Sequence, residues 1–236
     1  MASSIIPPSD RLIAALDVPS TDDARKIVDE LGDVVSFYKI GLQLFPVGGI
    51  DLARDLLVAG KKVFLDFKFY DIGATVRNAV VSVAGLGASF LTVHGDGDIM
   101  AGAVAGRGNA DLKLLAVTVL TSMDAHSLET LGLAGSVPDL VLKRARMALE
   151  AGADGVVASA LEVARLRQEL GNDFVIVTPG VRSPGIAHDD QKRVATPSDA
   201  IKAGADYLVV GREIIRAADK RAAAHNIMEQ ITQSFD

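Results

Sequence analysis

Cysteine does not occur anywhere in this chain of 236 residues. Its absence excludes a disulfide framework, a thiolate metal site and a thiol nucleophile. The first residues, MASSIIPPSD, have no basic segment followed by an apolar run, so we expect no signal peptide. No apolar stretch approaches the roughly 20 residues that a membrane span requires. These absences predict a cytoplasmic protein without a membrane partner.

A basic excess is also lacking, since 24 Lys and Arg stand against 30 Asp and Glu and the formal net charge is −6. This balance argues against a nucleic-acid partner, which favours a basic face. A small anionic substrate is compatible with it, because such a substrate needs only a local positive site.

Short, continuously apolar runs recur along the chain and predict eight strands. They cover residues 12–18, 37–41, 62–68, 90–94, 113–120, 155–159, 174–178 and 207–211. Segments with helical spacing lie between them, and examples are residues 21–31, 47–59, 76–86, 140–150 and 160–170. Strands that alternate with helices indicate a parallel sheet, and continuously apolar strands indicate that both sheet faces are covered.

The number of units decides the predicted architecture. Eight strands in 236 residues give about 29 residues per unit, the size of one βα repeat. The segment Ala-Gly-Ala-Asp occurs at 151–154 and again at 203–206, which favours repeated units. We therefore expect an α/β fold, a (β/α)8 TIM barrel that forms a single domain over residues 1–236, with residues 1–10 as a short N-terminal extension. Residues 121–139, in part helical, and residues 182–196 are candidate long loops of the kind that form lids.

Charged residues at the carboxyl ends of barrel strands are candidate site residues, because these ends build the active site of such a fold. In the third predicted strand, Asp66 and Lys68 are two residues apart and point to the same side. Phe67 and Phe69 point the other way, toward the covering helices. The charged pair is therefore expected inside the barrel mouth.

A structural ion pair is the alternative interpretation of Asp66 and Lys68 taken alone. Asp17 and Lys39 belong to the first two strands, and they favour a site, because a purely structural pair needs no further charges.

Gly211 and Arg212 follow the eighth strand, at the usual phosphate site of this fold. A glycine lets the backbone approach a ligand closely, and an arginine offers a fixed fork of donors. The alternative for Arg212 is a solvated arginine at the start of the last helix.

The run from Asp66 to Thr75, DFKFYDIGAT, resembles the Asp-x-Lys-x-x-Asp-Ile-x-x-Thr signature of orotidine 5′-monophosphate decarboxylases. Further similar segments occur in order along nearly the whole chain: ALD at 15–17, KIG at 39–41, VTVLTSM at 117–123, TPGVR at 178–182 and VGR at 210–212. Many family members have His at position 70 and Pro-Asn at 73 and 74, where this chain has Tyr70, Gly73 and Ala74. This departure puts the local loop shape and the dimer contact in doubt, not the charged positions.

The resemblance implies the last step of de novo pyrimidine nucleotide synthesis, the decarboxylation of orotidine 5′-monophosphate to UMP, without cofactor or metal. It implies four charged catalytic residues, Lys39, Asp66, Lys68 and Asp71. Lys68 would protonate C6 of the pyrimidine and stabilise the carbanion, and Asp66 would lie beside the substrate carboxylate. Asp71, with Ile72 and Thr75, would come from the partner subunit of a homodimer.

The remaining implied residues bind the substrate. Asp17 and Lys39 would hold the ribose hydroxyls, and Thr121 would read the pyrimidine edge. Arg182, Gln191, Gly211 and Arg212 would hold the phosphate. Without the resemblance, Thr121 is equally a strand-end turn residue and Gln191 a solvated loop residue.

Two other functions compete with this one. Magnesium-dependent sugar-phosphate decarboxylases and aldolases have a third-strand motif similar to the one in this chain. They carry an acidic metal ligand on the second strand, where this chain has Lys39. A non-catalytic phosphate-binding barrel would be expected to lose the strand-end charges that this chain keeps. His94, Asp96 and Asp98 follow no metal-ligand spacing that indicates a site, and a structural His94 is favoured.

Overall fold

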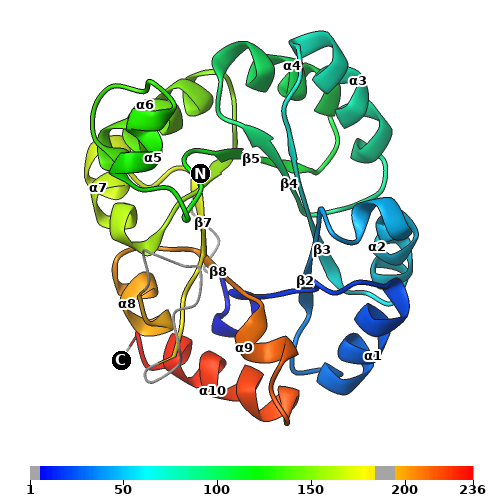
Figure 1. The fold of residues 1–236 in the computed structure, drawn as a ribbon. Helices are drawn as coiled ribbons and strands as arrows, with labels where there is room; N and C mark the ends of the chain where they lie inside the picture. The colour runs from blue at the N-terminus through cyan, green and yellow to red at the C-terminus, as the bar shows by residue number, and fades with distance from the viewer. Residues whose placement is uncertain (1–5, 184–194, 236) are drawn as a thin grey trace.

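The computed structural model describes residues 6–183 and 195–235. Eight parallel strands close into a barrel, in which each strand pairs with the next and β8 pairs with β1 (Figure 1). The strands are β1 Leu12–Ala15, β2 Phe37–Gly41, β3 Lys62–Phe69, β4 Phe90–His94, β5 Lys113–Val117, β6 Gly155–Val157, β7 Val175–Pro179 and β8 Tyr207–Val210. The predicted single-domain (β/α)8 barrel is confirmed. The assignment of residues 1–10 to an extension stays a prediction.

Helices surround the barrel and cover its outer face (Figure 1). The longer ones are α1 Thr21–Leu31, α2 Gly49–Val58, α3 Gly73–Ala84, α4 Gly97–Arg107, α6 Val137–Glu150, α7 Ala160–Leu170 and α10 Lys220–Thr232. The shorter ones are α5 Ala125–Thr130, α8 Pro197–Lys202, α9 Arg212–Ile215 and the 3-10 turns η1 Pro8–Asp10 and η2 Phe45–Val47. In the part of the chain that the structure describes, no helix has both the length and the apolar character needed to cross a membrane.

Several element boundaries differ from the predictions. The runs predicted as strands at 12–18 and 113–120 end as strands at Ala15 and Val117. Buried residues follow the last residue that pairs with a neighbouring strand, so the apolar run is longer than the strand. Burial alone therefore does not mark where a strand ends. The helix predicted over 76–86 covers Gly73–Ala84 instead. Its first three residues, Gly73, Ala74 and Thr75, carry no large apolar side chain, so the apolar spacing did not reveal them.

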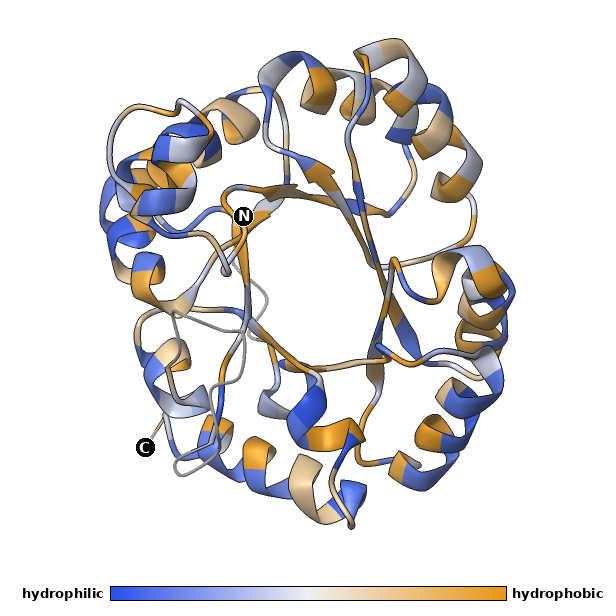
Figure 2. Ribbon diagram, viewed as in Figure 1, coloured by the Kyte–Doolittle hydropathy of each residue, from blue (hydrophilic) through white to orange (hydrophobic). Residues whose placement is uncertain are grey.

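The apolar core has two layers. Inside the barrel, Phe37, Phe64, Phe90 and Tyr207 pack together, with ring centroids of Phe90 and Tyr207 5.1 Å apart. Because three of these residues begin their strands, the aromatic rings fill the amino-terminal end of the barrel. The second layer lies between strands and helices. Figure 2 shows mostly hydrophobic residues along the strands and a mixture of hydrophobic and hydrophilic residues on the helices. The carboxyl end is therefore the end left open for a site.

The repeated Ala-Gly-Ala-Asp segments have a common structural role at the amino-terminal end. Asp154 accepts a hydrogen bond from the backbone N–H of Leu114 and pairs with Arg107. Asp206 accepts one from the N–H of Ile176, at 2.8 Å, and pairs with Arg167. Each aspartate precedes one strand and binds the strand before it, so the two Asp–Arg clasps tie β5 to β6 and β7 to β8.

Candidate active site

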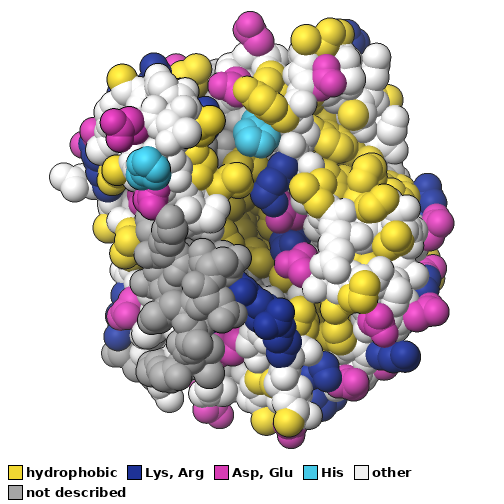
Figure 3. Space-filling model, viewed as in Figure 1, with side chains coloured by type: hydrophobic (Ala, Val, Ile, Leu, Met, Phe, Trp, Pro, Cys, Tyr) yellow, Lys and Arg dark blue, Asp and Glu magenta, His cyan; other side chains and the backbone are white. Residues whose placement is uncertain are grey.

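A cavity of about 570 Å³ opens at the carboxyl ends of the strands. This volume lies within the range of small-molecule sites, roughly 300–1,000 Å³. Figure 3 shows the hollow at the centre of the barrel mouth, with charged side chains inside it and hydrophobic ones on its walls. Of the predicted site residues, those that line the cavity are Asp17, Lys39, Asp66, Lys68, Thr121, Arg182, Gly211 and Arg212.

Four charges of alternating sign form a continuous chain across β1, β2 and β3. Lys39 Nζ lies 2.9 Å from Asp17 Oδ1 and 3.5 Å from Asp66 Oδ2. Lys68 Nζ lies 2.7 Å from Asp66 Oδ1. Lys39 is almost fully buried, whereas Lys68 and Asp17 are partly exposed to the cavity. We call these four residues the charge array.

Mutual neutralisation keeps the buried members of the array ionised. Burial by itself would lower the pKa of Lys39, but the charges of Asp66 and Asp17 outweigh it and hold that pKa above its ordinary value. Burial would raise the pKa of Asp66, but Lys39 and Lys68 outweigh it and hold that pKa below its ordinary value. The cavity therefore presents fixed charges rather than neutral groups.

The strand that carries Asp66 and Lys68 is irregular at this point. Leu65 pairs with Leu91 and Phe69 with Val93, so three residues of β3 lie opposite Thr92 alone. Lys68 has φ of 49°, the only positive φ among non-glycine residues in the described ranges 6–183 and 195–235. We call this stretch the β3 bulge.

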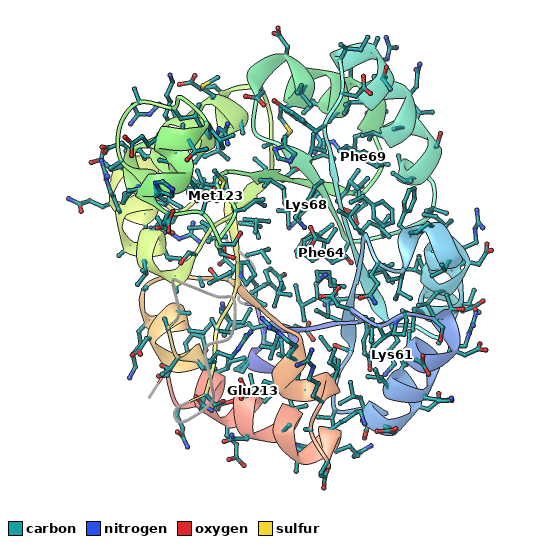
Figure 4. The ribbon with its side chains drawn as sticks, viewed as in Figure 1. Lys61, Phe64, Lys68, Phe69, Met123 and Glu213 are labelled. Carbon is teal, nitrogen blue, oxygen red and sulfur yellow. The ribbon has the colours of Figure 1, made fainter. Side chains whose placement is uncertain are left out.

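The predicted sidedness of the strand holds in spite of the β3 bulge. Lys68 and Phe64 point into the barrel, and Phe69 points outward (Figure 4). Phe67 is buried in the outer layer, with its ring 4.5 Å from that of Phe45. The spacing of two residues between Asp66 and Lys68 correctly predicted that both side chains face the cavity. The backbone between them is nevertheless not a regular strand.

The wall formed by β7 and β8 carries the other cations. Arg212 begins α9 directly after Gly211, and Arg182 is buried with Nη1 donating to the carbonyl of Val181 at 2.7 Å. A Cβ at Gly211 would make only ordinary contacts, the nearest 3.5 Å away at Ala15 Cβ. Packing within the protein therefore does not require this glycine, and the space it leaves faces the cavity.

The structure does not bring every predicted residue to the cavity. Asp71, Ile72 and Thr75, all of which it describes, are exposed and are not among the residues that line the cavity. Asp71 Oδ1 accepts a hydrogen bond from the N–H of Ile72 at 2.7 Å. Gln191 lies outside the described residues.

His94 lies at the end of β4 and is half-buried, with its ring centroid 4.5 Å from that of Tyr70. Burial lowers the pKa of His94, and the neighbouring charges of Arg144 and Lys68 lower it further. Within residues 6–183 and 195–235, no group of three His, Asp or Glu side chains is arranged to hold a metal ion.

Comparison with known proteins decides the family. The family model described as "Orotidine 5'-phosphate decarboxylase / HUMPS family" matches residues 10–227. The chain belongs to this family.

Relatives named orotidine 5′-phosphate decarboxylase extend over nearly the whole chain. The one from Nitrobacter winogradskyi is 56% identical over 226 residues, which are 96% of this chain and 94% of that protein. One from Rhodopseudomonas palustris is 53% identical over 95% of this chain and 96% of its own. A solved structure, orotidine 5′-phosphate decarboxylase from Lactobacillus acidophilus, has a TM-score of 0.83 and 38% identity and covers 94% of this chain and 99% of its own.

One departure from the common pattern of the orotidine 5′-phosphate decarboxylases has a visible packing consequence. Gly73 begins α3, and a Cβ there would come within 3.0 Å of the carbonyl oxygen of Asp98 on α4. A glycine therefore lets α3 begin close to α4. Tyr70 is largely exposed, and its ring contacts that of His94 at an interplanar angle of 46°. Nothing in the structure explains Ala74.

Three residues near the charges were not predicted from the sequence. Gln43 and Arg216 line the cavity, and Thr92 contacts the charge array without lining it. The position of Arg216, one helical turn after Arg212, was an available signal. Thr92 shares one face of β4 with Phe90, which lies inside the barrel. This alternation was the signal that the Thr92 side chain points inward.

Proposed function

We propose that this chain converts orotidine 5′-monophosphate to UMP and carbon dioxide, as its family relatives are named to do. The observation that carries the proposal is the charge array in the cavity, with Lys68 at one of its two partly exposed ends. Removal of carbon dioxide from C6 leaves a carbanion on a ring carbon with little delocalisation. Preorganised charges are the protein's means of stabilising such an anion.

Each member of the array has a proposed part in the reaction. Lys68 stabilises the carbanion by its charge and then delivers a proton to C6. Asp66 lies beside the substrate carboxylate and favours its departure, while Lys39 and Asp17 bind the ribose hydroxyls. The ion pairs hold these groups ready before substrate arrives, so little reorganisation is needed during the reaction.

The rest of the substrate occupies the opposite wall. Arg182, Gly211 and Arg212, together with Gln191, grip the phosphate, and Thr121 reads the pyrimidine edge. The position supports this assignment, because the loops after the seventh and eighth strands are the usual phosphate site of the barrel. The cytoplasmic location expected from the sequence stays a prediction.

The position of Lys39 favours this reaction over metal-dependent sugar-phosphate chemistry. Its ammonium lies between Asp17 and Asp66, where a divalent cation would otherwise find carboxylate ligands. A second cation there would be repelled. The chemistry is therefore proposed to need no metal and no organic cofactor.

This proposal predicts that purified protein consumes orotidine 5′-monophosphate in the presence of excess EDTA. The ultraviolet absorbance change that accompanies decarboxylation measures the rate, with and without added Mg²⁺. We expect equal rates. Activity lost in EDTA and restored by Mg²⁺ would favour the sugar-phosphate alternative, and UMP binding without turnover would favour a non-catalytic phosphate-binding barrel.

We also propose a two-fold homodimer in which Asp71, Ile72 and Thr75 complete the partner's cavity. All three are exposed just beyond β3 and lie off the cavity of their own chain. The neighbouring surface is apolar, since Leu42, Phe45 and Tyr70 are 58%, 45% and 64% exposed. A two-fold interface repeats the same contacts on both sides, so both cavities would be completed alike.

Arg212→Ala is expected to weaken UMP binding by roughly 10- to 100-fold, the usual loss for a hydrogen bond to a charged group. Binding of uridine, which has no phosphate, is expected to change little. Titration calorimetry with both ligands measures the difference. Arg54→Ala is the matched control, because Arg54 makes an exposed ion pair with Asp51 on α2, away from the cavity. If the binding of UMP and of uridine weakened equally, Arg212 would not act on the phosphate.

A further inference from the structure

Thr92 is a fully buried polar residue directly behind the charge array. Its hydroxyl donates a hydrogen bond to Asp66 Oδ1 at 2.9 Å and accepts one from the backbone N–H of Lys68 at 3.0 Å. Thr92 is not among the residues that line the cavity, although the structure describes it fully. Its hydroxyl therefore contacts both charged residues of β3 from the side away from a ligand.

The β3 bulge explains why a hydroxyl is needed at this position. Three residues of β3 lie opposite Thr92, so the regular exchange of backbone hydrogen bonds between β3 and β4 is interrupted there. The N–H of Lys68 is satisfied by the Thr92 side chain instead. This bond holds Lys68 at its positive φ, a conformation that a residue with a Cβ rarely adopts.

The same hydroxyl fixes the orientation of the Asp66 carboxylate. Oδ1 receives both the Thr92 hydroxyl and the Lys68 ammonium, which leaves Oδ2 directed at Lys39. A hydroxyl has one donor and two acceptor sites, so one group can serve both β3 residues at once. Valine has nearly the same shape but neither function.

We propose that Thr92 is a positioning residue, which sets the Lys68 backbone and the Asp66 carboxylate in the geometry used for turnover. Its effect on the rate rests on the proposed function, because that function gives Lys68 and Asp66 their roles. Thr92 itself touches no substrate. Thr92 bonds neither Asp17 nor Lys39, which are assigned to the ribose, nor the residues assigned to the phosphate. Substrate affinity should therefore be nearly independent of its hydroxyl.

The test compares Thr92→Val, which removes the hydroxyl, with Thr92→Ser, which keeps it. Thr92→Val is expected to lower kcat by roughly 10- to 100-fold, while KM and UMP affinity change by less than about 3-fold. Thr92→Ser is expected to restore most of the lost kcat. The matched control is Thr118→Val, because Thr118 is equally buried but, among the residues that the structure describes, its hydroxyl bonds only the carbonyl of Val157. That variant should lose thermal stability without a comparable loss of kcat.

Two kinetic outcomes would overturn the proposal. One is a Thr92→Val enzyme with kcat close to wild type. The other is a parallel loss of kcat, UMP affinity and thermal stability that serine does not repair, since this pattern marks a general packing defect.

Crystal structures of both Thr92 variants separate this proposal from the proposed function. We expect the Lys68 Nζ to Asp66 Oδ1 contact of 2.7 Å to persist with serine and to be lost with valine. If the wild-type chain does not decarboxylate orotidine 5′-monophosphate, the proposed function fails, while these structures still decide whether Thr92 positions Lys68. An unchanged Lys68 in Thr92→Val would overturn the positioning role.

Discussion

Lys68→Ala is expected to lower kcat for orotidine 5′-monophosphate by roughly 10⁴-fold or more, while UMP still binds. Lys68 is assigned both the proton that reaches C6 and the charge nearest the carbanion. Loss of a general acid costs roughly 10²- to 10⁴-fold, and loss of an electrostatic contact adds to it. The charge matters most as the carbanion forms, so the rate should suffer far more than nucleotide affinity.

Steady-state kinetics and UMP titration of the same preparation measure this contrast. Lys62→Ala is the matched control, because Lys62 lies at the other end of β3 and pairs with Asp10. The control should turn over at the wild-type rate. A Lys68→Ala enzyme with near-wild-type kcat would remove Lys68 from the chemistry.

Mixing two inactive proteins, Lys68→Ala and Asp71→Ala, is expected to regenerate activity at roughly a quarter of all sites. If Asp71 completes the partner's cavity, a mixed dimer collects both lesions in one site and leaves the other intact. Random subunit exchange makes about half of the dimers mixed, and one of their two sites is wild type. The recovered rate, measured against wild-type protein at the same total concentration, gives the fraction directly.

The matched control for this experiment is a mixture of Lys68→Ala with Asp66→Ala. Both of these residues belong to the cavity of their own chain, where their side chains are 2.7 Å apart. No site in the mixed dimer is then free of a lesion, and no activity should return. If the Lys68→Ala and Asp71→Ala mixture also stays inactive after subunit exchange is verified by mass, Asp71 acts within its own chain or not at all.

The barrel was predictable because its information is local. Apolar runs such as 62–68 are long enough to identify a strand, and a spacing of two places Asp66 and Lys68 on the same face. The ends of strands were less predictable, because a strand such as β1 ends where its neighbours stop pairing, at Ala15 opposite Lys39. That limit depends on residues far away in the sequence.

Parts of the candidate site could not be predicted for a related reason. The positive φ of Lys68 arises from the register between β3 and β4, which no pattern within either strand reveals. Thr92 is an ordinary strand residue until the β3 bulge places its hydroxyl between Lys68 and Asp66. The charged residues were found because charge at a strand end is unusual, whereas a threonine there is not.

The Asp–Arg clasps at Asp154 and Asp206 have an evolutionary consequence. They join neighbouring strands at the amino-terminal end, while the charge array and the cavity occupy the carboxyl end. Substitutions at the mouth can therefore alter specificity or reaction without reopening the barrel, and the clasps can be strengthened without touching a ligand. Selection for a ligand and selection for folding therefore act on different residues of this scaffold, and either set can change while the other is kept.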